Sequence, residues 1–216
     1  MQIERRSFVS RTLKSLLAMG AVLAIGLPAC AQTAGKDYTV IEPAQPTDNP
    51  AKIEVTEFFS YGCPHCSDFN PLVSAWAAKL PADVTFKKVP VSFNSYFAML
   101  APMSYALEST GQLARLDGEV FKAIHERGIK LENEKTRAEW VASMGVDARK
   151  FDEAYKSFGV MSKVKRAEQM TQLYRVRGVP ALAVDGKYLV TGKDFNDTLA
   201  IADKLIAKAR AEKAKK

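Results

Sequence analysis

The sequence predicts an α/β domain in which a β-α-β half and a β-β-α half flank an inserted block of helices. Three observations carry this prediction: a strand-helix-strand pattern over residues 52–91, helical periodicity over about residues 95–176, and a hairpin pattern followed by a helical one after residue 180. Hydrophobic residues make up 47% of the 216 residues and charged residues 25%, which is a globular composition. Disordered and fibrous classes are therefore excluded, and the length suits one domain with an insertion.

The first 31 residues have the layout of a secretory signal peptide. A basic stretch that ends at Lys14 precedes an apolar run of 12 residues, 16–27, and the small-x-small sequence Ala29-Cys30-Ala31 follows. The run is too short to cross a membrane as a helix, which takes about 20 residues. We therefore expect export, cleavage after Ala31, and a mature chain of residues 32–216 that lacks Cys30.

Two features of this segment leave alternatives open. Arg5-Arg6 resembles a twin-arginine export signal, so the sequence does not fix the export route. The segment Leu27-Pro28-Ala29-Cys30 resembles the box that precedes a lipid-anchored cysteine, and in that case Cys30 would be retained as the anchor.

The charge distribution argues against nucleic acid as a partner. The formal net charge is +7, and many of the positive residues lie in the first 31 residues or in residues 204–216. No basic stripe interleaved with aromatic residues accompanies them. We interpret the basic end as the solvated last turns of a helix, where cations complement the helix dipole.

The β-α-β half follows an irregular lead-in. Its strands are predicted by their β-branched and aromatic content, and its helix begins at a pair of cysteines and ends near Leu80, because Pro81 cannot continue a helix. In order, the predicted segments are a lead-in at 32–51 with a short edge strand at 38–41, a strand at 52–59, a helix from 63 to about 80, and a strand at 84–91.

The middle of the chain and the second half complete the fold. Apolar residues recur at helical spacing over about 95–176, with glycines between the runs, which predicts four or five helices. Such a stretch is too long for a loop, so we expect an inserted subdomain with its own core. Strands at 181–184 and 187–190 flank Asp185-Gly186, a strong two-residue hairpin signal, and a last helix is expected over about 194–211.

The sequence Cys63-Pro64-His65-Cys66 lies directly after a predicted strand and opens a helix. The first amides of a helix have no partners within it, so a thiolate at Cys63 would receive these N–H groups and the positive end of the dipole. Pro64 suits the first helical position, and His65 can add positive charge. Cys66 lies one turn further on, within reach of a disulfide. A pair with a stabilised thiolate prefers to be reduced, so it acts as an oxidant.

Other uses of these cysteines are less well supported. A zinc site needs four ligands, and beyond the cysteine pair only His65 and His125 are available as soft donors. We therefore expect no metal and no cofactor, and we interpret His125 as a histidine satisfied within the fold. A purely structural disulfide remains an alternative, but a chain of this length does not need one to hold a core.

Glu57 is the second candidate site residue. In the predicted strand it shares a face with the apolar side chains of Val55 and Phe59, and a buried carboxyl has a raised pKa that suits a general base for Cys66. Lys88 on the next strand can partner this acid. The alternatives are that Glu57 contacts solvent, because the register differs or because the strand end is half-exposed, and that Lys88 is a surface lysine.

Two segments resemble the DsbA family of periplasmic thiol:disulfide interchange proteins: residues 57–66 (EFFSYGCPHC) and residues 177–181 (RGVPA). The resemblance spans nearly the whole of residues 32–216, and the Pro-His dipeptide between the cysteines is the oxidase-type choice in this family. It implies a thioredoxin-like fold with an inserted all-helical subdomain. It also implies a periplasmic oxidase that donates the Cys63–Cys66 disulfide to newly exported proteins through a mixed disulfide at Cys63.

The resemblance also implies roles for single residues and partners. Reduced exported proteins would be the substrates, a DsbB-like membrane protein linked to quinone would reoxidise the pair, and the protein would be a monomer. The implied roles are Cys63 as exposed nucleophile, Cys66 as its buried partner, Pro64 and His65 as the intervening pair with His65 stabilising the thiolate, Glu57 as buried acid, Lys88 as its neighbour, and Val179 with a cis Pro180 as the substrate-binding backbone facing the disulfide.

Two other functions remain as alternatives. A disulfide isomerase or reductase would use the same cysteines, but isomerases of this class resemble dimers with a separate N-terminal dimerisation domain. Only about 20 residues separate the expected cleavage site from the strand at 52–59, which argues against such a domain. The other alternative is a peptide-binding folding module whose thiols are incidental.

Overall fold

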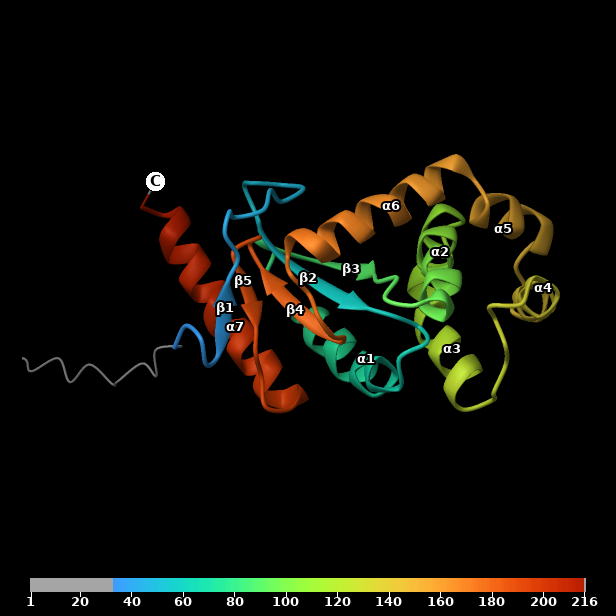
Figure 1. Ribbon diagram of the computed structural model, residues 1–216, viewed down its shortest axis with the longest axis horizontal. Helices are drawn as coiled ribbons and strands as arrows, with labels where there is room; N and C mark the ends of the chain where they lie inside the picture. Colours follow the sequence, from blue (N-terminus) through green and yellow to red (C-terminus); the bar gives the residue numbers. More distant parts are fainter. Residues whose placement is uncertain (1–32, 216) are drawn as a thin grey trace, which may run out of the picture. The chain divides into compact units, whose positions relative to one another are not determined.

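The computed structural model describes residues 33–215, and the expected signal peptide with its alternatives lies outside them. The described part contains a five-stranded sheet with strand order β1-β5-β4-β2-β3 (Figure 1). β2 and β3 are parallel, and the other neighbours are antiparallel. The strands are β1 (Tyr38–Val40), β2 (Ile53–Phe59), β3 (Val84–Pro90), β4 (Ala181–Val184) and β5 (Tyr188–Val190).

Helices cover both faces of this sheet, so the predicted α/β class is confirmed (Figure 1). α1 (Pro64–Ala77) and α7 (Phe195–Lys213) pack on one face, and α6 (Phe158–Leu173) lies along the other. The sheet separates two hydrophobic cores, because successive side chains along a strand point to opposite faces of the sheet. The first core includes Ile53, Val55, Leu182 and Val184 with Phe69, Val73 and Leu205, and the second includes Phe58, Val89 and Ala183 with Ala167 and Tyr174.

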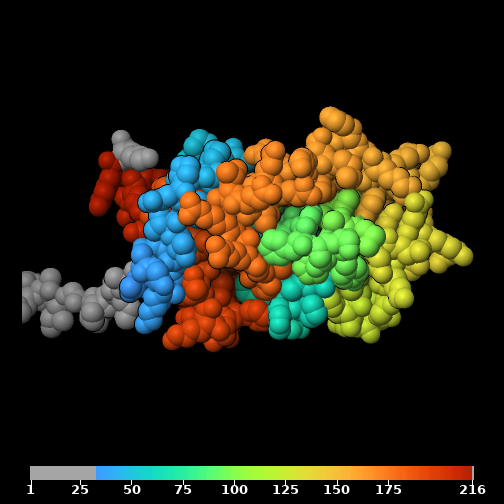
Figure 2. Space-filling view, viewed as in Figure 1, coloured from blue at the N-terminus to red at the C-terminus, as the bar shows by residue number. Residues whose placement is uncertain are grey.

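Five helices lie between Ser95 and Leu173, at the upper end of the predicted number. They are α2 (Ser95–Ser109), α3 (Leu113–His125), α4 (Glu134–Ser143), α5 (Ala148–Tyr155) and α6. Their own core includes Leu100, Met103, Leu116, Phe121, Trp140 and Phe151, and it continues onto Phe59, Tyr61 and both cysteines. In the space-filling view α2 to α5, coloured green to yellow, gather at one end of the described residues (Figure 2). None of the described helices is long and apolar enough to cross a membrane.

The hairpin between β4 and β5 has the geometry that its sequence predicts. Asp185 and Gly186 have φ angles of 53° and 65°, and the Lys187 N–H donates to the Val184 carbonyl at 3.0 Å. Two successive residues of positive φ define a type I′ turn, which matches the twist of the strands. A Cβ at position 186 would lie 2.0 Å from the Gln45 carbonyl oxygen, so glycine is also required by the close approach of the lead-in.

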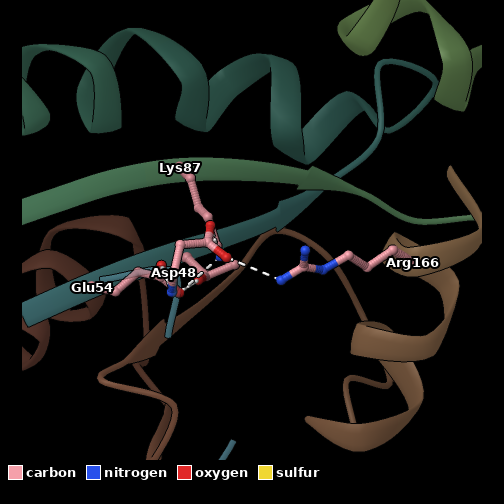
Figure 3. Close-up of polar contacts among 5 residues, drawn as sticks. Asp48, Glu54, Lys87 and Arg166 are labelled. Atoms are coloured by element: carbon pink, nitrogen blue, oxygen red, sulfur yellow. Dashed lines mark hydrogen bonds and ion pairs between the residues drawn. The ribbon is translucent and has the colours of Figure 1, made fainter. Parts of the chain in front are cut away.

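An ion cluster ties the lead-in and α6 to the parallel edge of the sheet (Figure 3). Lys87 Nζ on β3 lies 2.7 Å from Asp48 Oδ2 and 2.9 Å from Glu54 Oε1 on β2. The Asp48 N–H donates to Glu54 Oε2 at 3.0 Å, and Arg166 on α6 lies 3.0 Å from Asp48 Oδ1. Glu54 is only 3% exposed, so its charge depends on Lys87 for compensation.

We expect Lys87→Met to lower the free energy of unfolding by about 1–3 kcal/mol, because the substitution leaves the buried Glu54 carboxylate without its cation. Arg166→Ala is the matched control. It removes a largely exposed partner of Asp48 from the same cluster and should cost less than about 1 kcal/mol. Urea unfolding of the three proteins at neutral pH measures both values. Equal losses for the two variants would contradict the special dependence of Glu54 on Lys87.

Candidate active site

The two cysteines lie where β2 gives way to α1. Cys63 is the N-cap residue of α1 with φ −95° and ψ 118°, and Pro64 occupies the first turn. Both cysteines are thiols in this structure. Cys66 is fully buried and Cys63 is 7% exposed, so Cys63 is less exposed than the resemblance implied. Its sulfur is covered in part because it lies 3.5 Å from the Val179 carbonyl oxygen.

The surroundings of the two sulfurs shift their pKa values in opposite directions. The pKa of Cys63 is lowered to about 6, chiefly by a hydrogen bond from the Cys66 thiol, with further help from the backbone N–H groups of Cys66 and His65 and the positive charge of His65. The pKa of Cys66 is raised, because its thiol is held by Cys63 and the residue is buried. The favoured state of the dithiol near neutral pH is therefore a Cys63 thiolate beside a Cys66 thiol.

The Val179-Pro180 peptide bond is cis and faces the cysteines from the start of β4. Val179 also packs against the core that contains both sulfurs. A groove of about 370 Å³ follows this segment. Its lining consists of Val176, Arg177, Gly178, Val179, Pro180 and Ala181 with Leu189, Val190, Thr191, Gly192 and Thr198.

Glu57 lies on β2 directly opposite Lys88 of β3, so the structure brings together the predicted acid and its neighbour. Glu57 is fully buried, and neither carboxyl oxygen has a hydrogen-bond partner. Lys88 Nζ lies 3.7 Å from Glu57 Oε2. Burial raises the pKa of Glu57 to about 7, because the loss of hydration outweighs the attraction of Lys88. The alternative of a solvent-exposed Glu57 is therefore wrong: Glu57 is a buried acid, and burial holds its pKa well above the usual value of a carboxyl.

Three polar residues of this cluster escaped the sequence analysis. Lys88 Nζ donates to Asn70 Oδ1 and to Asp117 Oδ2, each at 2.8 Å, and the Tyr61 hydroxyl donates to Asp117 Oδ1 at 2.6 Å. Asn70 is on α1 and Asp117 is on α3 of the helical insertion. The nearest signal in the sequence is the position of Asp117 next to Leu116 and four residues before Phe121, on the buried side of α3.

His125 is satisfied within the fold, as expected. Its Nε2 lies 2.8 Å from the Tyr61 carbonyl oxygen, and its ring stacks on Phe121 with centroids 6.3 Å apart. Among residues 33–215, no group of three or more His, Cys, Asp or Glu side chains is placed to hold a metal ion. The chemistry available at this site is that of two unlike thiols and a buried acid.

Comparisons of the sequence and of the structure with known proteins identify the same family. Residues 76–202 match the family model of the DSBA-like thioredoxin domain. The thiol:disulfide interchange protein DsbA of Bordetella parapertussis is 40% identical over 207 residues, which cover 93% of this chain and 99% of that protein. The DsbA of Pseudomonas aeruginosa is 38% identical over 202 residues, which cover 92% and 96%.

Solved structures agree with these relatives. The crystal structure of Pseudomonas aeruginosa DsbA has a TM-score of 0.82 at 40% identity and covers 87% of this chain and 99% of that one. The structure of the oxidoreductase DsbA from Xylella fastidiosa has a TM-score of 0.80 at 34% identity, with 83% and 98% covered. The expected thioredoxin-like fold with an all-helical insertion is thereby confirmed. The chain belongs to the DsbA family, and it is a thiol:disulfide oxidoreductase of the oxidase type.

Proposed function

We propose that this protein works in the periplasm and donates the Cys63–Cys66 disulfide to reduced exported proteins. The observation that carries the proposal is the place of Cys63 at the N-cap of α1, where the backbone N–H groups of Cys66 and His65 stabilise its thiolate, beside a fully buried Cys66. A stable Cys63 thiolate favours the dithiol form over the disulfide form, so electrons flow from the substrate to the protein.

The first step is an exchange at Cys63. A substrate thiolate attacks the Cys63 sulfur, a mixed disulfide forms, and the bond between Cys63 and Cys66 breaks. Cys66 leaves as a thiolate, which is unfavourable in its buried position, so it takes a proton. Glu57 is the acid proposed to supply that proton, because its pKa of about 7 keeps a large fraction protonated at neutral pH.

The second step releases the oxidised substrate. The second substrate thiolate attacks the substrate sulfur of the mixed disulfide, and Cys63 leaves as a thiolate. A thiol of low pKa is a good leaving group, so the amides of α1 and the charge of His65 favour this step. Two electrons have then passed to the protein, which holds a Cys63 thiolate and a Cys66 thiol.

The cis segment is the proposed substrate-binding backbone. The Val179 carbonyl faces Cys63, and the groove beside Pro180 has room for an extended chain. Binding through backbone groups suits an enzyme that acts on many sequences, because main-chain hydrogen bonds do not depend on side chains.

Export and reoxidation complete the proposal. Residues 1–31 would direct export and be removed by cleavage after Ala31, which leaves a monomeric chain that starts at residue 32. The dithiol form then needs an electron acceptor, and a DsbB-like membrane quinone reductase is the proposed one. Relatives at about 40% identity named as DsbA support this general scheme.

A redox titration of the cysteine pair against glutathione tests the direction of electron flow. We expect a potential well above about −270 mV, the value of a reducing thioredoxin, because the dithiol form is stabilised at Cys63. The ratio of the two forms is read by thiol alkylation and mass spectrometry. A potential at or below the thioredoxin value would reject the oxidase in favour of a reductase.

Cys66→Ala should trap a mixed disulfide when the protein is incubated with oxidised glutathione, because nothing remains to resolve the adduct at Cys63. Cys63→Ala should form no such adduct, because the remaining thiol is buried and poorly ionised. Intact mass measures both. Full disulfide-forming activity of Cys63→Ala on a reduced substrate protein would instead support a binding module with incidental thiols.

The stability of the dithiol form should rise with pH relative to that of the disulfide form. The pKa of Cys63 is about 6 in the folded dithiol and about 8.5 in an unfolded chain. Ionisation of Cys63 therefore adds its full stabilisation to the folded state at a pH of about 8.5, and this stabilisation is lost as the pH falls to about 6. Urea unfolding of both forms across this window measures the difference. The disulfide form is the control because its Cys63 does not titrate. A difference that does not change with pH would contradict a lowered thiol pKa.

A further inference from the structure

The buried acid Glu57 has no direct route to solvent. Each disulfide donated requires Glu57 to give up one proton and regain it, yet its side chain is fully buried. A cavity of about 530 Å³ opens between α1 and α3 on this side of the molecule. The cavity is lined by Lys88 and Asp117 but not by Glu57.

Exposure rises in steps from the acid to this cavity. The side chains of Glu57, Lys88 and Asp117 are 0%, 12% and 16% exposed. Lys88 Nζ lies 3.7 Å from Glu57 Oε2 and 2.8 Å from Asp117 Oδ2, so the ammonium lies between the two carboxylates. A proton that enters from the cavity meets Asp117 and Lys88 before it meets Glu57.

Neighbouring side chains hold this link in place. The centres of the Phe59 and Phe121 rings lie 4.4 and 5.2 Å from Lys88 Nζ. Asn70 Oδ1 accepts a hydrogen bond from the same ammonium. The Tyr61 hydroxyl donates to the other oxygen of Asp117. Asp117 therefore has one oxygen for Tyr61 and one for Lys88, and it draws the ammonium closer to itself than to Glu57.

We propose that Asp117, contributed by the helical insertion, is a positioning residue for proton return to Glu57, and that the cavity between α1 and α3 is the route by which the proton enters. This inference rests on the proposed role of Glu57 as the acid that protonates Cys66. When Cys66 takes its proton, Glu57 becomes a carboxylate beside Lys88. One proton from cavity water then restores the acid, so that each disulfide donated takes up one proton by this route. The Cys66 thiol gives up one proton again when the pair is reoxidised.

The charges that act on Glu57 come from every element around it. They are Lys88 on β3, Asp117 on α3, the Cys66 sulfur on α1, and the Tyr61 hydroxyl that is bound to Asp117. Lys122 of α3 and Glu126, the residue after this helix, line the same cavity. Among residues 33–215, Asp117 is the one carboxylate besides Glu57 that pairs with Lys88, so its removal should let the Lys88 ammonium move closer to Glu57.

The test is a pH titration of the Glu57 carboxyl carbon by NMR in ¹³C-glutamate-labelled dithiol protein. In Asp117→Asn the midpoint should fall by about half to one pH unit, because a negative charge is lost and Lys88 turns to Glu57. Asp117→Glu should restore most of the shift. Glu119→Gln is the matched control, since it removes a partly exposed negative charge from the same helix and should leave the midpoint unchanged.

The kinetic readout is the pH profile for oxidation of a reduced model peptide. The profile of Asp117→Asn should move to lower pH together with the NMR midpoint, and the substitution should have no further effect on the profile in a Glu57→Gln background. An unchanged midpoint in folded, active Asp117→Asn would overturn the inference and leave the oxidase intact. Loss of the proposed function would appear differently, as a wild-type protein that does not oxidise the peptide at all.

Discussion

The site depends on the stabilisation of one negative sulfur at the N-terminus of α1. The backbone N–H groups of His65 and Cys66 are free at this point of the helix, and the Cys66 thiol adds a third donor. Burial acts against the charge, so the low pKa of Cys63 exists only because these donors outweigh the lost hydration. The same geometry leaves Cys66 buried and protonated. The difference between the two thiols sets the direction of electron flow, from the substrate to the cysteine pair.

A second constraint follows from the first. A buried Cys66 that must gain and lose a proton needs an acid at the same depth, and Glu57 on β2 is fully buried with a pKa near 7. A carboxyl in that position is costly unless a cation is near, and Lys88 on the adjacent parallel strand supplies it. The parallel pairing of β2 and β3 thus sets the electrostatics of the site as well as the architecture of the sheet.

The helical insertion is part of the site and not only an addition to the fold. Its core continues onto Phe59, Tyr61 and both cysteines, and α3 brings Asp117 to Lys88 and Tyr61. His125 of α3 holds the Tyr61 carbonyl just before the cysteines. The sheet half therefore supplies the sulfurs and the acid, while the insertion closes the apolar surroundings and contributes the second carboxylate.

The sequence by itself determined the strands, the helix that opens at the cysteines, the hairpin at Asp185-Gly186 and the pairing of two unlike thiols, because these depend on local chemistry: periodicity, free amides and turn residues. It also placed Glu57 and Lys88 on particular faces of their strands, but it did not determine how deeply their side chains are buried. Only the tertiary structure decided that Glu57 is fully buried, that Val179 faces Cys63, and that Asp117 lies beside Lys88. The physical reason is distance along the chain: burial and charge pairing arise from segments that meet only when the sheet, the cis segment and the insertion pack together.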